Sequence, residues 1–406
     1  MARTLEQHLA ADAGPKRILA LDGGGVKGIL TLGMLSVLEA ELRQRARDDG
    51  LVLSDYYDLI GGTSTGAIIA TGLALGLSVD ALIDMYLALG PKVFGKTAGD
   101  GVFLQSKFDA RKLRAALAPV LTTKTLGSDA LQTGLAIHAK RIDTGAAWVL
   151  TNHPRSKFFD PPTDAFTIAN KKYRLIDLVL ASAAAPTFFD EVVIDIARDG
   201  REATQQGLFV DGAVSGNNNP SISLFMLALE PSYAFCWRAG ADNLMMTSCG
   251  TGWRRPVVEA KAFHSLPPGM RGVHALRSMV FDTQLQGIAM MQAFSEPKKP
   301  WYVNAEVEDM RGACLTGAPL LDYQRMDVVL DRKLKPKSRR DPIPPMTKLE
   351  EMLGRELTVE ALEALDLLAN GKPDNMELLL EIGRKGGALY VDAAYPDPKF
   401  DLPEWR

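Results

Sequence analysis

The stretch that decides the fold is GTSTG at Gly62–Gly66, which follows YDLI at 57–60 and precedes the apolar AIIA at 67–70. A short strand, a turn that carries a serine and an apolar helix, in this order, form a nucleophile elbow. Gly62 and Gly66 let the chain bend sharply, because a glycine has no Cβ to clash with the neighbouring backbone. The turn exposes the Ser64 hydroxyl at the N-terminus of the helix. Because G-x-S-x-G is frequent by chance, further motifs are needed to predict a nucleophile here.

A glycine-rich turn, DGGGVKG at Asp22–Gly28, follows a strand-like apolar stretch at 17–21. A helix is expected next, because leucines repeat at the spacing of one helical face, at Leu32, Leu35, Leu38 and Leu42. Bare backbone N–H groups at the start of this helix suit a phosphate or the oxyanion of a tetrahedral intermediate. Gly23–Gly28 also fits the dinucleotide-binding pattern G-x-G-x-x-G. That alternative is less favoured, because its acidic residue, Glu39 or Glu41, would lie on the same helix instead of ending a second strand.

The third motif is GLFVDGA at 207–213, a short apolar strand that ends in Asp211 and continues into Gly212 and Ala213. Taken alone, Asp211 is better interpreted as a turn or capping aspartate. Its position after a strand is nevertheless where an α/β sheet presents catalytic groups, since ligands bind outside the carboxyl ends of the strands. Asp211 is therefore a candidate partner for Ser64.

Together, these motifs resemble those of the patatin-like phospholipase family, which carries a D-G-G-G-x-x-G oxyanion loop, a G-x-S-x-G elbow and a D-G-A/G motif in this order. The alanine-rich segment at 181–189 and SCGTG at 248–252 are also similar to segments of that family. The resemblance covers about residues 16–330 and says little about the substrate. It implies an α/β fold, a three-layer α/β/α sandwich. Alternating strands and helices likewise predict a mainly parallel central sheet covered on both faces.

The resemblance implies a catalytic dyad of Ser64 as nucleophile and Asp211 as general base. The N–H groups of Gly23, Gly24 and Gly25 would form the oxyanion hole, and an acyl-enzyme on the serine would be hydrolysed by water without a metal or another cofactor. The residues that complete the motifs are Asp22, Lys27, Gly28, Gly62, Gly66, Gly212 and Ala213. An ionised aspartate is a weak base towards serine, so Asp211 has to be partly desolvated or very well hydrogen-bonded.

The alternative within hydrolases is a full triad in the order Ser, acid, His. His264 and His274 both follow Asp211 in the chain. Their surroundings indicate a surface position and the start of a helix instead of a strand-end loop. The five histidines and three cysteines show no spacing typical of a metal site.

The composition is typical of an intracellular enzyme: 47% of the 406 residues are hydrophobic, 23% are charged and the net charge is −3. Such a balance predicts no global attraction to nucleic acid or anionic lipid. Three scattered cysteines favour a reducing compartment. Neither a signal peptide nor a run of ~18 apolar residues is present. We therefore expect a cytoplasmic protein that contacts the inner membrane peripherally when it is active.

Three segments are predicted: a catalytic domain at 16–330, a basic, proline-rich linker or loop at 331–346, and a helical extension at 347–406 packed on the core. Capping boxes are expected at Thr347–Glu350 and Asp374–Glu377. The basic linker could touch anionic lipid or a nucleotide, although charge runs are more often solvated surface. A glycine-rich loop is predicted at 91–106, as a lid, a membrane-touching loop or an ordinary connection.

The leading hypothesis is a lipid acyl hydrolase that cleaves fatty-acyl esters of membrane glycerophospholipids. Its alternative is a general carboxylesterase of soluble acyl substrates. Some bacterial members of the family belong to antiviral systems in which a cyclic oligonucleotide opens the enzyme, so a gated effector is a second hypothesis. A non-catalytic storage or scaffold protein is disfavoured by the intact Ser64 and Asp211. A homodimer is considered as an assembly, and neither DNA nor RNA is expected as a partner.

Overall fold

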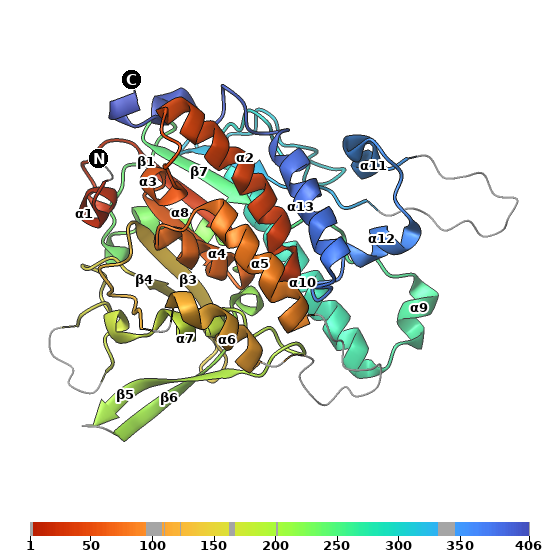
Figure 1. Cartoon of the computed structure of the whole chain (residues 1–406), viewed down its shortest axis with the longest axis horizontal. Coiled ribbons are helices and arrows are strands. Elements are labelled where there is room, and N and C mark those ends of the chain that lie inside the picture. Colours follow the sequence, from red (N-terminus) through yellow and green to blue (C-terminus); the bar gives the residue numbers. More distant parts are fainter. Residues whose placement is uncertain are drawn as a thin grey trace, which may run out of the picture.

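The computed structural model describes residues 3–94, 108, 110–121, 123–161, 167–199, 202–331 and 346–405. An eight-stranded sheet lies between layers of helices (Figure 1). Its order is β5-β6-β3-β2-β1-β7-β8, and β4 pairs with β3 off this path. The strands are β1 (Lys16–Leu21), β2 (Leu59–Thr63), β3 (Gly134–Arg141), β4 (Ala146–Thr151), β5 (Val192–Asp199), β6 (Glu202–Asp211), β7 (Leu244–Cys249) and β8 (Asp322–Met326).

The strands β3, β2, β1, β7 and β8 are parallel, whereas β4, β6 and β5 are antiparallel additions. Strand β1 lies between β2 and β7, and its last residue Leu21 is in register with Gly62 and Cys249. The segments that follow β1, β2 and β7 therefore leave the sheet at one edge, where α/β folds bind ligands. The predicted α/β fold with a mainly parallel sheet is confirmed.

Alternate residues of β1 face two different cores, as expected for a strand covered on both faces. Leu19 and Leu21 lie in the larger core with the helices α2, α4, α5, α7 and α13, whereas Ile18 and Ala20 lie in the second core with α8. The α-helices are α1 (Leu5–Leu9), α2 (Gly28–Ala46), α3 (Leu53–Tyr56), α4 (Thr65–Ala74), α5 (Val79–Phe94), α6 (Ala110–Leu121), α7 (Leu175–Ser182), α8 (Ser221–Leu229), α9 (Ala260–Ser265), α10 (Pro268–Ala293), α11 (Lys348–Leu353), α12 (Val359–Ala364) and α13 (Pro373–Gly387). Short 3₁₀ turns are η1 (Gly25–Lys27), η2 (Asn170–Lys172), η3 (Gly212–Ser215), η4 (Pro231–Tyr233), η5 (Pro398–Phe400) and η6 (Pro403–Trp405).

The C-terminal helices share the main core. Helix α13 packs along α2, where Gly383 and Gly33 face each other (Figure 1). The capping box at Thr347 is confirmed, because its side chain accepts from the Glu350 N–H and Glu350 accepts from the Thr347 N–H. The one at Asp374 is wrong, because α13 begins at Pro373. Residues 332–345 lie outside the described residues, so the division into domain, linker and extension stays a prediction.

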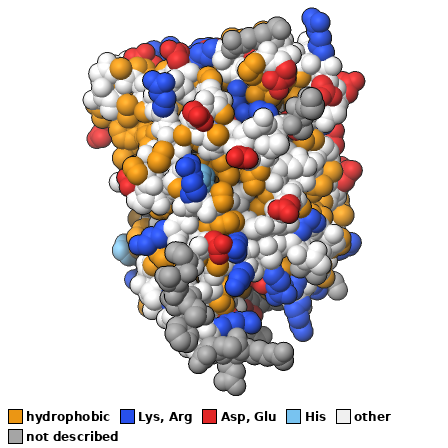
Figure 2. Space-filling view, turned by 90° about the vertical axis from the view of Figure 1, so that its left-hand side faces the viewer, with side chains coloured by type: hydrophobic (Ala, Val, Ile, Leu, Met, Phe, Trp, Pro, Cys, Tyr) orange, Lys and Arg blue, Asp and Glu red, His pale blue; other side chains and the backbone are white. Residues whose placement is uncertain are grey.

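Part of the loop predicted at 91–106 is helical. Helix α5 continues to Phe94 with Pro91 inside it, and the lid hypothesis for 95–106 lies outside the described residues. Within the described parts of the chain, no helix combines the length and the apolar character that a membrane span requires. Basic, acidic and hydrophobic side chains are interspersed on the face shown in Figure 2.

Candidate active site

The serine lies on a strained elbow between β2 and α4. Ser64 has φ +56° and ψ −123°, a conformation that a residue with a side chain rarely adopts. A Cβ at Gly62 would overlap the backbone of Gly66, and a Cβ at Gly66 would overlap the carbonyl of Leu21. The two glycines are therefore required by close backbone contact as well as by the bend.

The elbow is held by a hydrogen-bond chain from neighbouring elements. The Ser64 N–H donates to the Ser182 Oγ at 2.8 Å, and the Ser182 hydroxyl donates to the His138 carbonyl at 2.6 Å. Ser182 is fully buried at the end of α7, so a hydrogen-bonded partner is needed for its hydroxyl. Ser182 has no motif of its own in the sequence, and its only signal is its place in the alanine-rich segment at 181–189.

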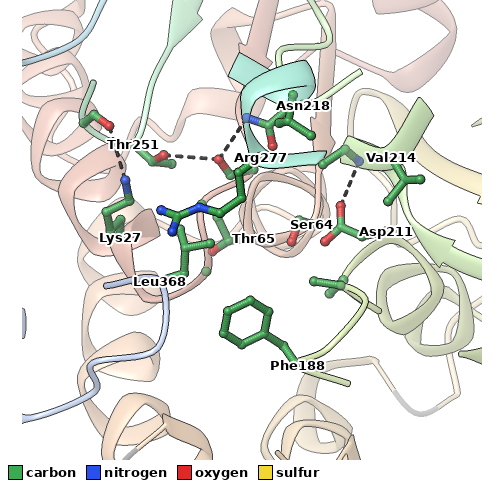
Figure 3. A pocket seen from close by; sticks show the side chains of 18 of the residues that line it. Lys27, Ser64, Thr65, Phe188, Asp211, Val214, Asn218, Thr251, Arg277 and Leu368 are labelled. Atoms are coloured by element: carbon green, nitrogen blue, oxygen red, sulfur yellow. Dashed lines mark hydrogen bonds between the residues drawn. The ribbon is translucent and has the colours of Figure 1, made fainter. Parts of the chain in front are cut away.

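Asp211 ends β6 opposite Ala139 of β3, and its N–H donates to the Ala184 carbonyl at 2.9 Å. Its Oδ1 accepts the Ala213 N–H at 2.8 Å. The oxygens of Ser64 and Asp211 face each other (Figure 3). Burial raises the pKa of Asp211 to about 6, against the lowering effects of the Ala213 N–H and of a hydrogen bond with Ser64. The desolvation that a Ser-Asp dyad needs is therefore present, since the residue Asp211 is only 3% exposed.

Two of the three N–H groups expected to form the oxyanion hole are available for that role, those of Gly24 and Gly25. The Gly23 N–H donates to the Asn218 carbonyl at 3.0 Å, which corrects its expected role as an oxyanion donor. The N–H groups of Gly24 and Gly25 have no hydrogen-bond partner among the described residues. Gly25 has φ +58°, and a Cβ there would overlap the Leu368 carbonyl.

A fully buried ionic cluster anchors the start of this loop. Arg325 on β8 donates to both oxygens of Asp22, at 3.0 and 2.6 Å, and also to Asp327 at 2.7 Å. Gln284 of α10 donates to Asp22 at 2.7 Å. Burial disfavours the charged guanidinium, but the two carboxylates outweigh this effect and raise the pKa of Arg325 well above its ordinary value. The cluster fixes the direction in which the chain leaves β1, and no local pattern in the sequence indicated it.

Ser64 and Asp211 open into a pocket with about 1500 Å³ of empty space, part of it open to solvent. One part of its wall is apolar and comes from α4, α5, α6 and the 186–189 turn: Ile68, Leu89, Phe94, Leu113, Phe188 and Phe189. Figure 3 places Phe188 beside the dyad and Lys27, Arg277 and Leu368 on the side of Ser64 away from Asp211. The pocket therefore combines a hydrophobic wall with a cationic end.

The cationic end holds three basic side chains and one carboxylate. Lys27 is 7% exposed, donates to the Gly252 carbonyl at 3.3 Å, and has a pKa that burial lowers. Arg254 and Arg277 approach Asp366 at 3.7 and 3.9 Å. Both distances are longer than the roughly 2.7–2.9 Å of a charge-assisted hydrogen bond. Lys27 was expected only as motif support, and the two arginines were not expected at all.

The model of the family "Patatin-like phospholipase" matches residues 19–224. The chain belongs to this family. Patatin-T5 of Solanum tuberosum is 29% identical over 248 residues, 58% of this chain and 60% of that protein. The cGAMP-activated phospholipase of Vibrio cholerae is 30% identical over 227 residues, 51% of this chain and 56% of that protein. The chain thus spans only about three fifths of the length of these relatives.

The solved structure of human GIVD cytosolic phospholipase A2 is similar with a TM-score of 0.46 and 12% identity, over 94% of this chain and 60% of that one. The patatin-like motifs around Ser64 and Asp211 lie within the matched residues, whereas Arg254, Arg277 and Leu368 lie beyond them. The cationic end of the pocket is thus formed largely by the part of the chain outside the family model.

No histidine is among the described residues that line the pocket of Ser64, so the alternative triad has no third member there. His264 lies on α9 and His274 on α10, and neither lines the pocket of Ser64. His138 is buried behind the elbow, with its ring nitrogens near the Gly62 carbonyl at 3.3 Å and the Ser223 Oγ at 2.9 Å. No group of three or more histidine, cysteine or acidic side chains in the described part of the chain is placed to hold a metal ion.

Proposed function

We propose that this patatin-like protein is a lipid acyl hydrolase of the phospholipase A type that acts through Ser64 and Asp211. The observation that carries the proposal is the strained Ser64 facing a buried aspartate whose pKa is raised to about 6, at the bottom of a largely apolar pocket. A base poised near neutral pH is what removal of the serine proton requires.

In the proposed reaction, Asp211 accepts the proton of Ser64 as Oγ attacks the ester carbonyl. The oxyanion is stabilised by the N–H groups of Gly24 and Gly25, each typically worth about 3 kcal/mol. Collapse of the tetrahedral intermediate breaks the bond to the alcohol oxygen, which takes the proton from Asp211. Water then attacks the acyl-enzyme while Asp211 accepts one of its protons. The bond between the acyl carbon and Ser64 Oγ breaks, Asp211 returns the proton to Oγ, and the fatty acid leaves.

The walls of the pocket favour a phospholipid over a small soluble ester. The apolar side has room for an acyl chain, and Lys27 and Arg277 at the other end suit a phosphate group. A general carboxylesterase of small soluble esters would need neither the apolar side nor the basic side chains. Lys27→Met should therefore raise KM for phospholipid in mixed micelles and leave the hydrolysis of uncharged short-chain esters within about twofold. An unchanged KM for phospholipid in the Lys27→Met variant would favour the general esterase.

Fatty-acid release from phospholipid vesicles tests the activity itself. Ser64→Ala and Asp211→Asn should each abolish release, whereas His264→Ala with His274→Ala should retain it. Activity that survives Asp211→Asn and disappears with the histidine variant would mean a conventional triad. No release by the wild-type chain from vesicles or soluble esters, with or without cyclic dinucleotides, would contradict the proposal and favour the storage or scaffold alternative.

We also propose that a cyclic oligonucleotide gates the enzyme, as part of antiviral defence, because one relative is a cGAMP-activated phospholipase. A structural observation fits this idea: the segment after α12 contacts the oxyanion loop, and Leu368 accepts the Val26 N–H at 2.9 Å. Adding cGAMP and other cyclic dinucleotides should raise vesicle hydrolysis at least tenfold. Full activity without nucleotide and no response to any of them would contradict gating while leaving the hydrolase proposal intact.

Action at the inner membrane from the cytoplasm, assembly as a homodimer and the absence of nucleic acid among the partners remain predictions. Sedimentation of the full chain, with and without vesicles, measures the first two. A filter-binding assay with DNA and RNA measures the third.

A further inference from the structure

An arm that comprises residues 254–286 projects from the sandwich next to the pocket (Figure 1). It contains a connecting segment at 254–259, helix α9 and helix α10 up to Gln286. None of these residues is buried, and the first buried residue of α10 is Gly287. The C-terminal part of the arm is packed on one side, since Phe281 contacts the Trp253 ring and Gln284 donates to Asp22. Packing of an apolar face supplies most of the stability of a helix in a protein, so the apolar side chains that remain exposed on the arm need another explanation.

The arm is a formed element held together internally. The Arg271 guanidinium donates to the Leu266 carbonyl at 3.0 Å and to the His264 carbonyl at 2.8 Å, which ties α9 to the start of α10. The rings of Phe263 and His274 lie 5.6 Å apart. The arm can therefore present a surface of defined shape.

The charge of the arm is opposite to that of the whole chain. Residues 254–286 contain five basic and two acidic residues, a net charge of +3, whereas the chain as a whole carries −3. The arm is therefore more positive than the chain as a whole. Arg255 and Lys261 are exposed, and no ion pair of either is present among the described residues.

Large apolar side chains are exposed between these charges. Val257 is 73% exposed, Met279 is 63% exposed and Leu276 is 36% exposed. Leu276, with Arg277 of the same helix, also lines the pocket of Ser64. Leu276 thus belongs both to the exposed apolar side chains of the arm and to the lining of the pocket.

We propose that the arm is the surface by which this protein docks onto an anionic lipid bilayer, a proposal that rests on the lipid acyl hydrolase function. Exposed apolar side chains among basic ones are the pattern of an interfacial helix, which inserts its apolar side chains at the headgroup boundary. Each basic side chain near an anionic surface strengthens binding about fivefold. Docking through the arm places the pocket entrance against the substrate.

A second copy of the chain is the less suitable occupant. A two-fold interface through this surface would place the same patch of both copies face to face, and so a net charge of +3 against +3. Anionic lipid compensates that charge, whereas the arm of another copy repels it.

Binding can be measured apart from catalysis with the Ser64→Ala protein, by co-sedimentation with sucrose-loaded vesicles. Vesicles of phosphatidylcholine with phosphatidylglycerol should bind the protein at least tenfold more tightly than vesicles of phosphatidylcholine alone, and salt should weaken the difference. Equal binding to both vesicles would overturn the electrostatic part of the proposal.

Two double variants locate the surface. Arg255→Gln with Lys261→Gln, and Val257→Ser with Met279→Ser, should each weaken binding to the anionic vesicles at least tenfold. The matched control is Val193→Ser with Phe158→Ser, two side chains exposed by 53% and 57%, the first on β5 far from the arm. The proposal is overturned if the control weakens binding as much, or if neither arm variant does.

Hydrolysis of a soluble short-chain ester separates this proposal from the proposed function. With Ser64 intact, the arm variants should hydrolyse that ester at the wild-type rate and lose activity only on vesicles. A wild-type chain that binds anionic vesicles through the arm and hydrolyses nothing would contradict the hydrolase function alone. Arm variants that change the sedimentation of the free protein and not vesicle binding would assign the surface to a second copy.

Discussion

Asp211→Asn should abolish ester hydrolysis and at the same time stabilise the folded protein at pH 8. Above pH 6 the wild-type fold holds the ionised carboxylate of a residue that is 3% exposed, hydrogen-bonded to the Ala213 N–H at 2.8 Å. Asparagine keeps an oxygen for that hydrogen bond and carries no charge. The substitution therefore removes the cost of burying a charge, which is the cost that makes Asp211 a useful base.

The magnitude follows from the pKa, which is raised from 3.8 to about 6 in the folded state. The folded state thus binds the proton more tightly than the unfolded state does. This group costs the wild type no stability below pH 3.8; its cost grows as the pH rises from 3.8 to 6 and is complete above 6. Two pKa units correspond to about 3 kcal/mol. We expect the variant to gain up to about 3 kcal/mol at pH 8 and close to nothing at pH 4.

Urea unfolding followed by circular dichroism at both pH values measures the difference. Ser64→Ala is the matched control, because it abolishes activity but keeps the charge of Asp211 and removes the hydroxyl that stabilises it. This control should be less stable than the wild type at pH 8. An asparagine variant that is no more stable than the wild type at pH 8, or that gains equally at both pH values, would refute the reasoning.

Below pH 6 the carboxyl group of Asp211 becomes protonated, so kcat/KM for a soluble ester should fall about tenfold per pH unit. A kcat/KM that does not change between pH 6 and pH 4.5 would contradict this prediction. Arg325→Gln leaves Asp22 buried without its guanidinium and should cost about 3–5 kcal/mol in urea unfolding. Arg355→Gln, at an exposed ion pair, is its control and should change stability little. Gly25→Ala, at φ +58° and against a carbonyl of the C-terminal segment, should lower kcat at least a hundredfold in a protein that still folds. Gly145→Ala, at φ +71° with open space around it, should leave kcat unchanged, and an equal loss in both variants would exclude the steric explanation.

Several features could be predicted from residues close together in the chain. Gly62 is required by the turn itself, because a Cβ there would overlap the backbone of Gly66, whereas Gly66 is also required by a contact with Leu21 of the neighbouring strand. The strand that ends at Asp211 could also be predicted, because an apolar run followed by a polar residue is a local pattern. Two local predictions were wrong. Pro91 lies inside α5, where a loop was predicted to begin, and Pro373 begins α13 one residue ahead of the expected capping residue Asp374.

Short stretches of sequence were enough to predict Ser64 as the nucleophile, Asp211 as its candidate base and the glycine loop, because short-range sterics and strand periodicity leave few other conformations for these segments. The surroundings of these residues depend on contacts between segments far apart in the chain. The pKa of Asp211 depends on burial by distant segments, and Gly23 is excluded as a donor by Asn218, almost 200 residues away. The ion pair of Arg325 with Asp22 likewise could not be predicted from the sequence, because a buried charge and its partner need to be close in space and not along the chain.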